Sequence, residues 1–228
     1  GLVVVNAAAG TVLNPDHLVD ATTVKLAGNA SIAASDLDEL ASVLDLNGHQ
    51  LTVTNYVSGS LASVNNKNSG TLLVETAVDA VLVATDLLEA DAIKLTANLT
   101  ADSTELESIA ERLTTAFDLA GNDLTLTGYT DENLANISVD DTEQLNVVLL
   151  NSASTGNEVL DLDPTKLGQV TSISFGTDQP AAEGEVLTSV ELTYSELESF
   201  APPSIFPTET DTTLASFITF VDNNGDLT

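Results

Sequence analysis

The chain has 228 residues, with 35 Asp and Glu against 5 Lys and Arg, a formal net charge of -30, and 43% hydrophobic residues. Disorder requires high charge with low hydrophobicity, so this composition favours a folded chain with a core. Five cationic side chains cannot form a basic patch, which excludes nucleic acid as a partner. No apolar run approaches the roughly 20 residues of a membrane-spanning helix, so we expect no membrane insertion. Because residue 1 is Gly and not Met, we expect a mature or excised piece of a longer precursor.

The sequence repeats itself. Residues 1–26 align without gaps with residues 70–95, and residues 45–64 align with residues 118–137. A third, partial copy follows, in which residues 163–167 are similar to residues 14–18. We therefore expect a repeat domain over 1–176, made of units 1–69 and 70–142 and a partial unit 143–176, followed by a capping or assembly segment over 177–228.

Short apolar runs predict strands at 2–5, 23–26, 44–46, 72–74, 93–95, 117–119, 147–150 and 172–175. Their starts are roughly 20 to 30 residues apart, which excludes tight hairpins and favours parallel strands joined by return segments. The predicted fold class is β-rich α/β, a parallel-sheet solenoid in which a short helix or turn follows each strand. We expect the strands up to residue 119 to share one sheet, with Leu26 and Leu95 in the core. The C-terminal segment is also predicted to be β-rich.

Two of the return segments carry helix signals. Residues 35–38 and 104–107 match the capping-box pattern, which predicts Ser35 and Thr104 as N-caps. Each pattern is followed by apolar residues at helical spacing.

The turns after two strands carry a further pattern. Residues 117–124 fit L-x-L-x-x-N-x-L with Asn122 in the asparagine position, and residues 44–51 fit it with His49 there. These stretches resemble leucine-rich repeats, in which a buried asparagine caps backbone groups where the chain leaves the strand. The lead-in is irregular and the larger period is about 70 residues, so the resemblance is one of strand-turn geometry. The acidic units rich in Thr, Asn, Asp and Leu also resemble repeat units of bacterial surface-layer, adhesin and extracellular filament proteins. That resemblance implies a structural protein at the cell surface.

Residues that carry chemistry are few. Cysteine is absent, the two histidines are not repeat equivalents, and no phosphate-binding loop, dinucleotide fingerprint or nucleophile elbow occurs. We predict no catalytic residue and no enzyme activity. Tyr56 and Tyr129 are repeat equivalents, which favours a structural ladder over a sugar-stacking platform. A carbohydrate-binding or carbohydrate-active module, a lyase or glycosidase, is the alternative, and Arg112 marks the place to look for its site.

The excess of carboxylates points to Ca²⁺ as the only candidate cofactor, because this cation prefers several hard oxygen ligands. Its candidate ligands form three clusters: Asp222, Asn224 and Asp226; Asp140, Asp141 and Glu143; Asp161 and Asp163. The first cluster is similar to the opening D-x-N-x-D of a calcium loop, but it lacks the closing glutamate. The alternative is an acidic surface suited to saline surroundings.

The C-terminal segment holds an apolar, β-forming stretch at 213–221, behind three prolines between residues 202 and 207. Such a stretch suits a cap over the end of a solenoid or strand addition to a neighbouring subunit. The expected function is therefore a non-enzymatic subunit of an extracellular filament, surface layer or adhesin stalk. We expect it to polymerise head-to-tail with copies of itself. Its expected assembly residues are Leu2, Val4, Phe217, Ile218 and Phe220.

Overall fold

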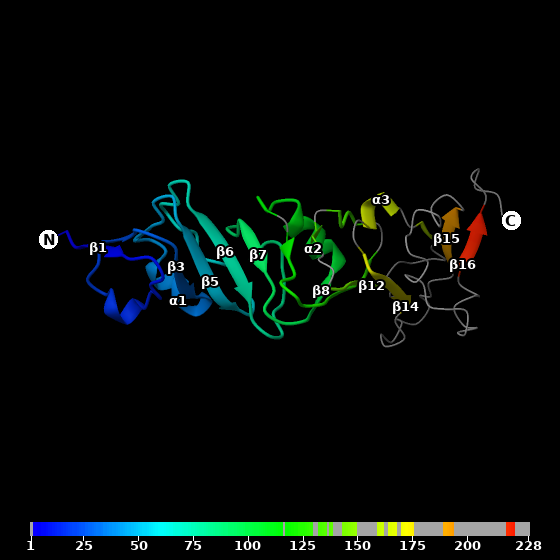
Figure 1. Cartoon of the computed structure of the whole chain (residues 1–228), viewed down its shortest axis with the longest axis horizontal. Coiled ribbons are helices and arrows are strands. Elements are labelled where there is room, and N and C mark those ends of the chain that lie inside the picture. The colour runs from blue at the N-terminus through cyan, green and yellow to red at the C-terminus, as the bar shows by residue number, and fades with distance from the viewer. Residues whose placement is uncertain are drawn as a thin grey trace. The chain divides into compact units, whose positions relative to one another are not determined.

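The computed structural model describes residues 2–115, 117–129, 132–135, 137–138, 143–149, 159–161, 164–167, 170–175, 189–193 and 218–221. These residues form a mixed α/β structure with parallel sheets and few helices (Figure 1). The chain divides into two compact units, one of residues 1–99 with 108–122 and the other of residues 100–107 with 123–228.

The first unit begins with a small parallel sheet of three strands. Its order is β1 (Val4–Ala7), β2 (Thr23–Leu26), β4 (Leu44–Asp45). Val4 pairs with Thr23, and Val24 pairs with Leu44, so each strand adds to the edge of the one before it. Between β1 and β2, the 3-10 helix η1 (Pro15–His17) turns the chain, and the Asn14 side chain accepts the N–H of Asp16 at its start.

A second parallel sheet of the first unit supplies most of its core. Alternation places Leu51 and Val53 inside, and the same alternation places their partners Leu72 and Val74 inside. Helix α1 (Ala34–Leu40) follows the first strand and buries Leu37 and Leu40. Its strands within the first unit, in spatial order, are β3 (Ala30–Ala33), β5 (Gln50–Tyr56), β6 (Thr71–Thr76), β7 (Ala92–Lys94) and β9 (Phe117–Asp118).

The second unit contains two further sheets. The first has the order β8 (Leu99–Asp102), β10 (Leu124–Thr127), β12 (Leu145–Leu149), β14 (Ser172–Phe175). The second has the order β13 (Val159–Asp161), β15 (Ser189–Thr193), β16 (Ile218–Val221), and its pairings are parallel. The remaining elements are helix α2 (Ser103–Ala110), strand β11 (Ile137–Ser138) and helix α3 (Pro164–Leu167).

Parallel pairing is confirmed, but the single sheet is wrong. The predicted runs up to residue 46 belong to the sheet of β1, β2 and β4, whereas the runs from 72 to 119 belong to the sheet of β3 and β5. The repeat aligns residues 2–5 with residues 71–74, yet β1 and β6 belong to different sheets. Successive stretches of the chain each supply two strands, β2 then β3 and β4 then β5, one to each sheet, and β6 pairs with β5. The strands β3, β5, β8 and β10 were not predicted. Leu26 and Leu95 are buried, as expected.

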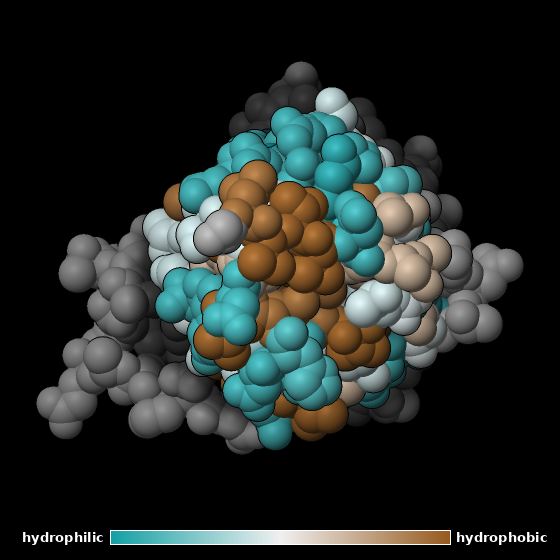
Figure 2. Space-filling view, turned by 90° about the vertical axis from the view of Figure 1, so that its left-hand side faces the viewer, coloured by the Kyte–Doolittle hydropathy of each residue, from teal (hydrophilic) through white to brown (hydrophobic). Residues whose placement is uncertain are grey.

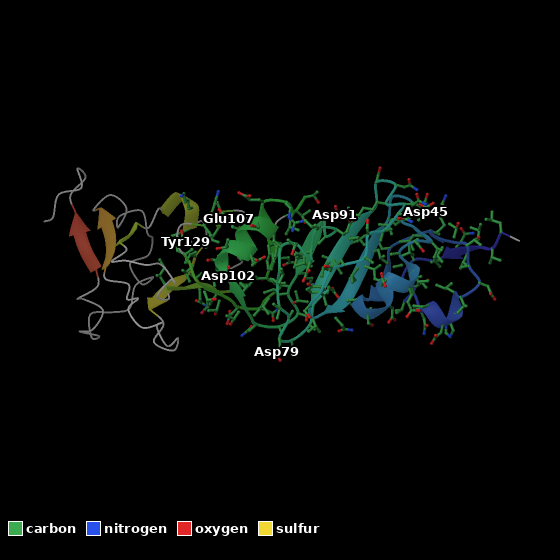
Figure 3. All side chains as sticks on the ribbon, turned by 180° about the vertical axis from the view of Figure 1, so that it is seen from behind. Asp45, Asp79, Asp91, Asp102, Glu107 and Tyr129 are labelled. Carbon is green, nitrogen blue, oxygen red and sulfur yellow. The ribbon has the colours of Figure 1, made fainter. Side chains whose placement is uncertain are left out.

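The predicted helix caps are also wrong. Helix α1 begins after Ala33, which makes no side-chain cap, and the Ser35 hydroxyl donates to the Asp36 carboxylate instead. In α2 the cap is Asp102, whose Oδ1 accepts the N–H groups of Thr104 at 3.0 Å and Glu105 at 3.2 Å (Figure 3). A carboxylate directly before the first helical residue reaches these donors, whereas a hydroxyl inside the first turn does not.

The asparagine of the turn motif acts as predicted in one copy only. The Asn122 Nδ2 donates to the carbonyl oxygens of Leu119 at 3.0 Å and Leu95 at 3.3 Å. In the earlier copy the prediction of His49 is wrong, because the Asn47 Nδ2 donates to the carbonyl oxygen of Leu26 at 3.0 Å. Asn47 has a φ of 51°, a left-handed conformation that asparagine tolerates better than most residues, so the cap moves to another position of the same turn.

Candidate functional site

The first unit presents an apolar face beside β1. Five large apolar side chains before residue 20 are between 42% and 81% exposed, and Figure 2 shows apolar side chains gathered on this face. We call this set the apolar face; it consists of Leu2, Val3, Val4, Val12 and Val19. Grouped exposure of this kind is typical of an interaction surface, whereas scattered apolar residues are not.

Backbone hydrogen bonds hold the segments that carry two of these side chains, Val3 and Val12. The Val3 carbonyl oxygen accepts the N–H of Thr22 at 2.9 Å, which fixes the start of the chain against β2. Val12 bridges Ser31 in parallel, and the N–H of the next residue, Leu13, donates to the Ser31 carbonyl oxygen. Leu13 is buried, so strand alternation turns Val12 outward.

Strand β1 also ends its sheet. It pairs with β2 on one side, and no strand among the described residues pairs with its other side, which we call the free edge of β1. Strand β16 likewise ends the β13-β15-β16 order. It pairs with β15 on one side, and no strand among the described residues pairs with its other side, which we call the free edge of β16. Unpaired edges offer N–H and C=O groups to another strand. Of the expected assembly residues, Leu2 and Val4 lie on the apolar face, Ile218 and Phe220 belong to β16, and Phe217 lies outside the described residues.

A polar groove of about 440 Å³ lies on the outer side of the second sheet of the first unit. Its lining residues are Gln50, Thr71, Leu73, Asp91, Ala92, Ile93, Thr114, Thr115 and Asp118. Asp91 lies in this lining (Figure 3), and its Oδ2 accepts the N–H of Leu72 at 2.8 Å. The Lys67 Nζ lies 3.3 Å from the same oxygen and 3.5 Å from the Glu89 carboxylate. The hydroxyl, amide and carboxylate groups of this lining can form hydrogen bonds with the hydroxyls of a sugar, and its aliphatic side chains can contact the C–H groups of a sugar ring. This groove was not predicted.

Arg112, the predicted marker of a carbohydrate site, has a structural role. Its guanidinium donates to the carbonyl oxygens of Ala84 at 2.9 Å, Leu87 at 3.4 Å and Ser108 at 3.1 Å. These bonds hold the return segment before β7 against the end of α2. Thr114, two residues later, lines the groove, and the carbohydrate site itself stays a prediction.

The candidate calcium ligands are mostly beyond what the structure describes. Asp222, Asn224, Asp226, Asp140, Asp141 and Asp163 lie outside the described residues, and Asp161 is the last residue of β13. Glu143 is described and buried. Within the described part of the chain, no group of three or more His, Asp or Glu side chains is placed to hold a metal ion.

A buried carboxylate that the sequence analysis missed lies at the start of α2. The Glu132 carboxylate accepts the hydroxyls of Ser103 at 3.1 Å and Thr104 at 3.0 Å, and it is only 5% exposed. One residue later, the Asn133 N–H donates to the Glu107 carboxylate at 2.7 Å, which ties the loop to the helix. The alignment of the two copies could have indicated a special role for this side chain, because Glu132 aligns with a glycine, Gly59, in the first copy.

In the first copy the same place is a cavity of about 230 Å³. Gly59 has no side chain to fill it, and Ala34 replaces the first hydroxyl. The adjacent Tyr56 hydroxyl is buried and has no hydrogen-bond partner, so burial, together with the Asp86 carboxylate, raises the pKa of Tyr56 to about 12. Tyr56 and Tyr129 are both buried, which excludes a sugar-stacking role for their rings. The cavity is lined by Ala34, Ser35, Asn55, Tyr56, Val57, Ser58, Gly59, Ser60 and Leu61.

Neither a protein-family model, nor a curated protein, nor a solved structure matches the chain. None of the helices in the described part of the chain has both the length and the apolar character that crossing a bilayer requires.

Proposed function

We propose that the chain is a non-enzymatic structural subunit of an extracellular assembly, a filament, surface layer or adhesin stalk, and that it associates with copies of itself. The observation that carries this proposal is the apolar face beside the free edge of β1. An edge strand flanked by exposed apolar side chains combines the two features that favour association with another chain.

We further propose that the parallel strands form a solenoid, in which the return segments resemble those of leucine-rich repeats. The support is the spacing of the partners: Val4 pairs with Thr23, Leu51 with Leu72 and Val74 with Ile93, each roughly 20 residues later in the chain. A solenoid exposes core residues at its ends, and these ends need a cap or a partner. The apolar face is what such an end would present.

The energy of the apolar face sets the strength of the association. Complete burial of a Val or Leu side chain contributes roughly 1.5 to 3 kcal/mol, so burying the exposed fractions of these five contributes about 5 to 10 kcal/mol. Association itself costs roughly 4 to 15 kcal/mol. Apolar contact alone is therefore marginal, and the net charge of -30 opposes it at low salt.

The test is sedimentation equilibrium of the chain over a range of protein and NaCl concentrations. We expect association that strengthens with salt. The double variant Val12→Ser/Val19→Ser removes about 2 to 3 kcal/mol of apolar burial and should weaken association roughly 30- to 160-fold. The control, Val57→Ser/Val81→Ser, removes two valines elsewhere that are about half exposed and should have no effect. A chain that stays monomeric at high concentration and high salt would refute the proposal.

A carbohydrate-binding module is the second candidate, and the polar groove supports it. Its volume of about 440 Å³ falls within the range of small-ligand sites. Calorimetric titration with soluble glucose and N-acetylglucosamine oligomers tests it. Saturable binding that Asp118→Asn and Thr114→Val abolish would support a sugar site, and the absence of binding to both series would remove it.

A further inference from the structure

We propose that strand β16 of one copy adds in parallel to the free edge of β1 in the next copy. This inference rests on the proposed function, self-association, and names the two surfaces that meet. The pairing would extend the parallel ladder from one chain into the next. It would join unlike surfaces, and such head-to-tail contacts produce open filaments when they do not close into a ring.

The polarity of the sheets supports this pairing. In the orders β1-β2-β4 and β13-β15-β16 the strands follow chain order, so each strand adds on the side away from the strand before it. The free edge of β1 is therefore the side that a preceding strand would occupy, and the free edge of β16 is the side that a following strand would occupy. Parallel connections keep one handedness, so these two edges are complementary.

Pairing between two copies of β1 is disfavoured by the same observation. Identical edges of two chains meet only in antiparallel orientation about a twofold axis. Every strand pairing whose register the structure describes is parallel. A parallel junction would repeat the geometry already present within the chain.

The composition of the two strands is the second support. Edge strands are normally protected by charged side chains, and this chain has 35 acidic residues to provide them. Yet β1 (VVNA) and β16 (ITFV) contain no charged residue, as is also true of the edge strands β3 (ASIA) and β14 (SISF), whereas the edge strands β4 and β13 end in Asp45 and Asp161. Both strands are four residues long, which matches the four-residue ladder between β1 and β2.

Backbone hydrogen bonds between the two strands would add to the free energy of association that burial of the apolar face contributes. A junction of four residues adds several inter-strand hydrogen bonds, each with a modest net contribution of roughly 0.5 to 1.5 kcal/mol. Together with the burial of the apolar face, these bonds exceed the lower part of the range for the cost of association.

Disulfide cross-linking tests the pairing, because the chain contains no cysteine. Asn6 is exposed on β1, so the Asn6→Cys variant is mixed in turn with four second variants and treated with a mild oxidant. These variants are Ile218→Cys, Thr219→Cys, Phe220→Cys and Val221→Cys. Successive residues of a strand face opposite sides, so we expect mixed dimers at two alternate positions of β16 and not at the other two. The matched control, Asp38→Cys on the exposed side of α1, should give no mixed dimer.

The other outcomes are distinct. A disulfide dimer of Asn6→Cys alone would show two β1 strands face to face and overturn the pairing, while self-association would stand. Association by sedimentation without a cross-link at any of the four positions would overturn it in the same way. A monomeric disulfide in the double variant Asn6→Cys/Phe220→Cys would show that the chain closes on itself. That result, or a monomer under all conditions, would remove both proposals.

Discussion

Replacing Ala33 by Asp should stabilise helix α1, because α1 begins without a side-chain cap and α2 begins with one. Ala33 has a φ of -68° and a ψ of 144°, the extended conformation of an N-cap residue. An Asp there has the geometry of Asp102, which accepts two N–H groups at 3.0 and 3.2 Å. Exchanging Ala for a capping residue contributes roughly 0.5 to 2 kcal/mol, typically about 1.

The expected gain is reduced by charge. The new carboxylate enters a chain of net charge -30 and lies close to Asp36 in the first turn, so the gain should fall in the lower half of that range. A change of about 1 kcal/mol in the free energy of unfolding shifts the melting temperature by roughly 2 to 4 °C for a chain of this length. Scanning calorimetry and urea unfolding both resolve such a shift.

Two further variants isolate the cap. Ala33→Asn provides the same hydrogen bond without the charge and should gain more than Ala33→Asp at low salt, with the difference vanishing at high salt. Asp102→Ala should lose about 1 kcal/mol. If Ala33→Asn gains nothing and Asp102→Ala loses nothing, side-chain capping does not stabilise these helices and the reasoning is refuted.

Three other changes have definite expected results. The pKa of Tyr56 rises from 10.0 to about 12 on folding, so the free energy of unfolding is highest below pH 10 and falls as the pH rises to 12. Tyr56→Phe should flatten that loss in urea unfolding, and absorbance at 295 nm should show a late tyrosine ionisation that this variant removes. Arg112→Ala should lower the free energy of unfolding by about 1 to 3 kcal/mol, because three backbone carbonyl oxygens lose their donor. Arg112→Lys should retain only part of the stability of the original chain, and full stability with lysine would contradict the hydrogen-bonding role of the guanidinium. If carboxylates coordinate Ca²⁺, a chelator should lower the melting temperature or release subunits, and NaCl at matched ionic strength should not reverse these effects. Equal melting curves for the chelator-treated and the calcium-loaded protein would leave only the interpretation of an acidic surface screened by salt.

The parallel strands were predictable because apolar runs such as Val24–Leu26 recur at a spacing that only a return segment fits. Strand β5 was not, because its threonines and asparagine also suit a turn, and only the alternate burial of Leu51 and Val53 distinguishes the two. The capping boxes failed for a similar reason. The hydroxyl-x-x-carboxylate pattern is present, but Asp102 precedes it and lies closer to the helical donors.

The apolar face was predicted only in part. Leu2 and Val4 belong to an apolar run and were identified, whereas Val12 and Val19 are isolated in turn-rich sequence without periodicity. The groove could not be predicted, because it collects residues from β5, β6, the start of β7 and the segment before β9, which parallel pairing brings together. The buried Glu132 left a trace in the alignment, but its burial depends on hydroxyls that lie almost 30 residues earlier.

The short distance along the chain between paired strands has a consequence for how the protein folds. Val4 and Thr23, or Leu51 and Leu72, meet by closing loops of roughly 20 residues, and loop closure of this size costs little more entropy than that of a short turn. Folding can then advance in one direction, with each new strand adding to the edge of the last one formed. If folding advances along the sequence of the chain, β1 and β2 pair before β4 adds to them. The edge on which β1 receives β2 is therefore occupied early, whereas no strand among the described residues adds to its opposite edge.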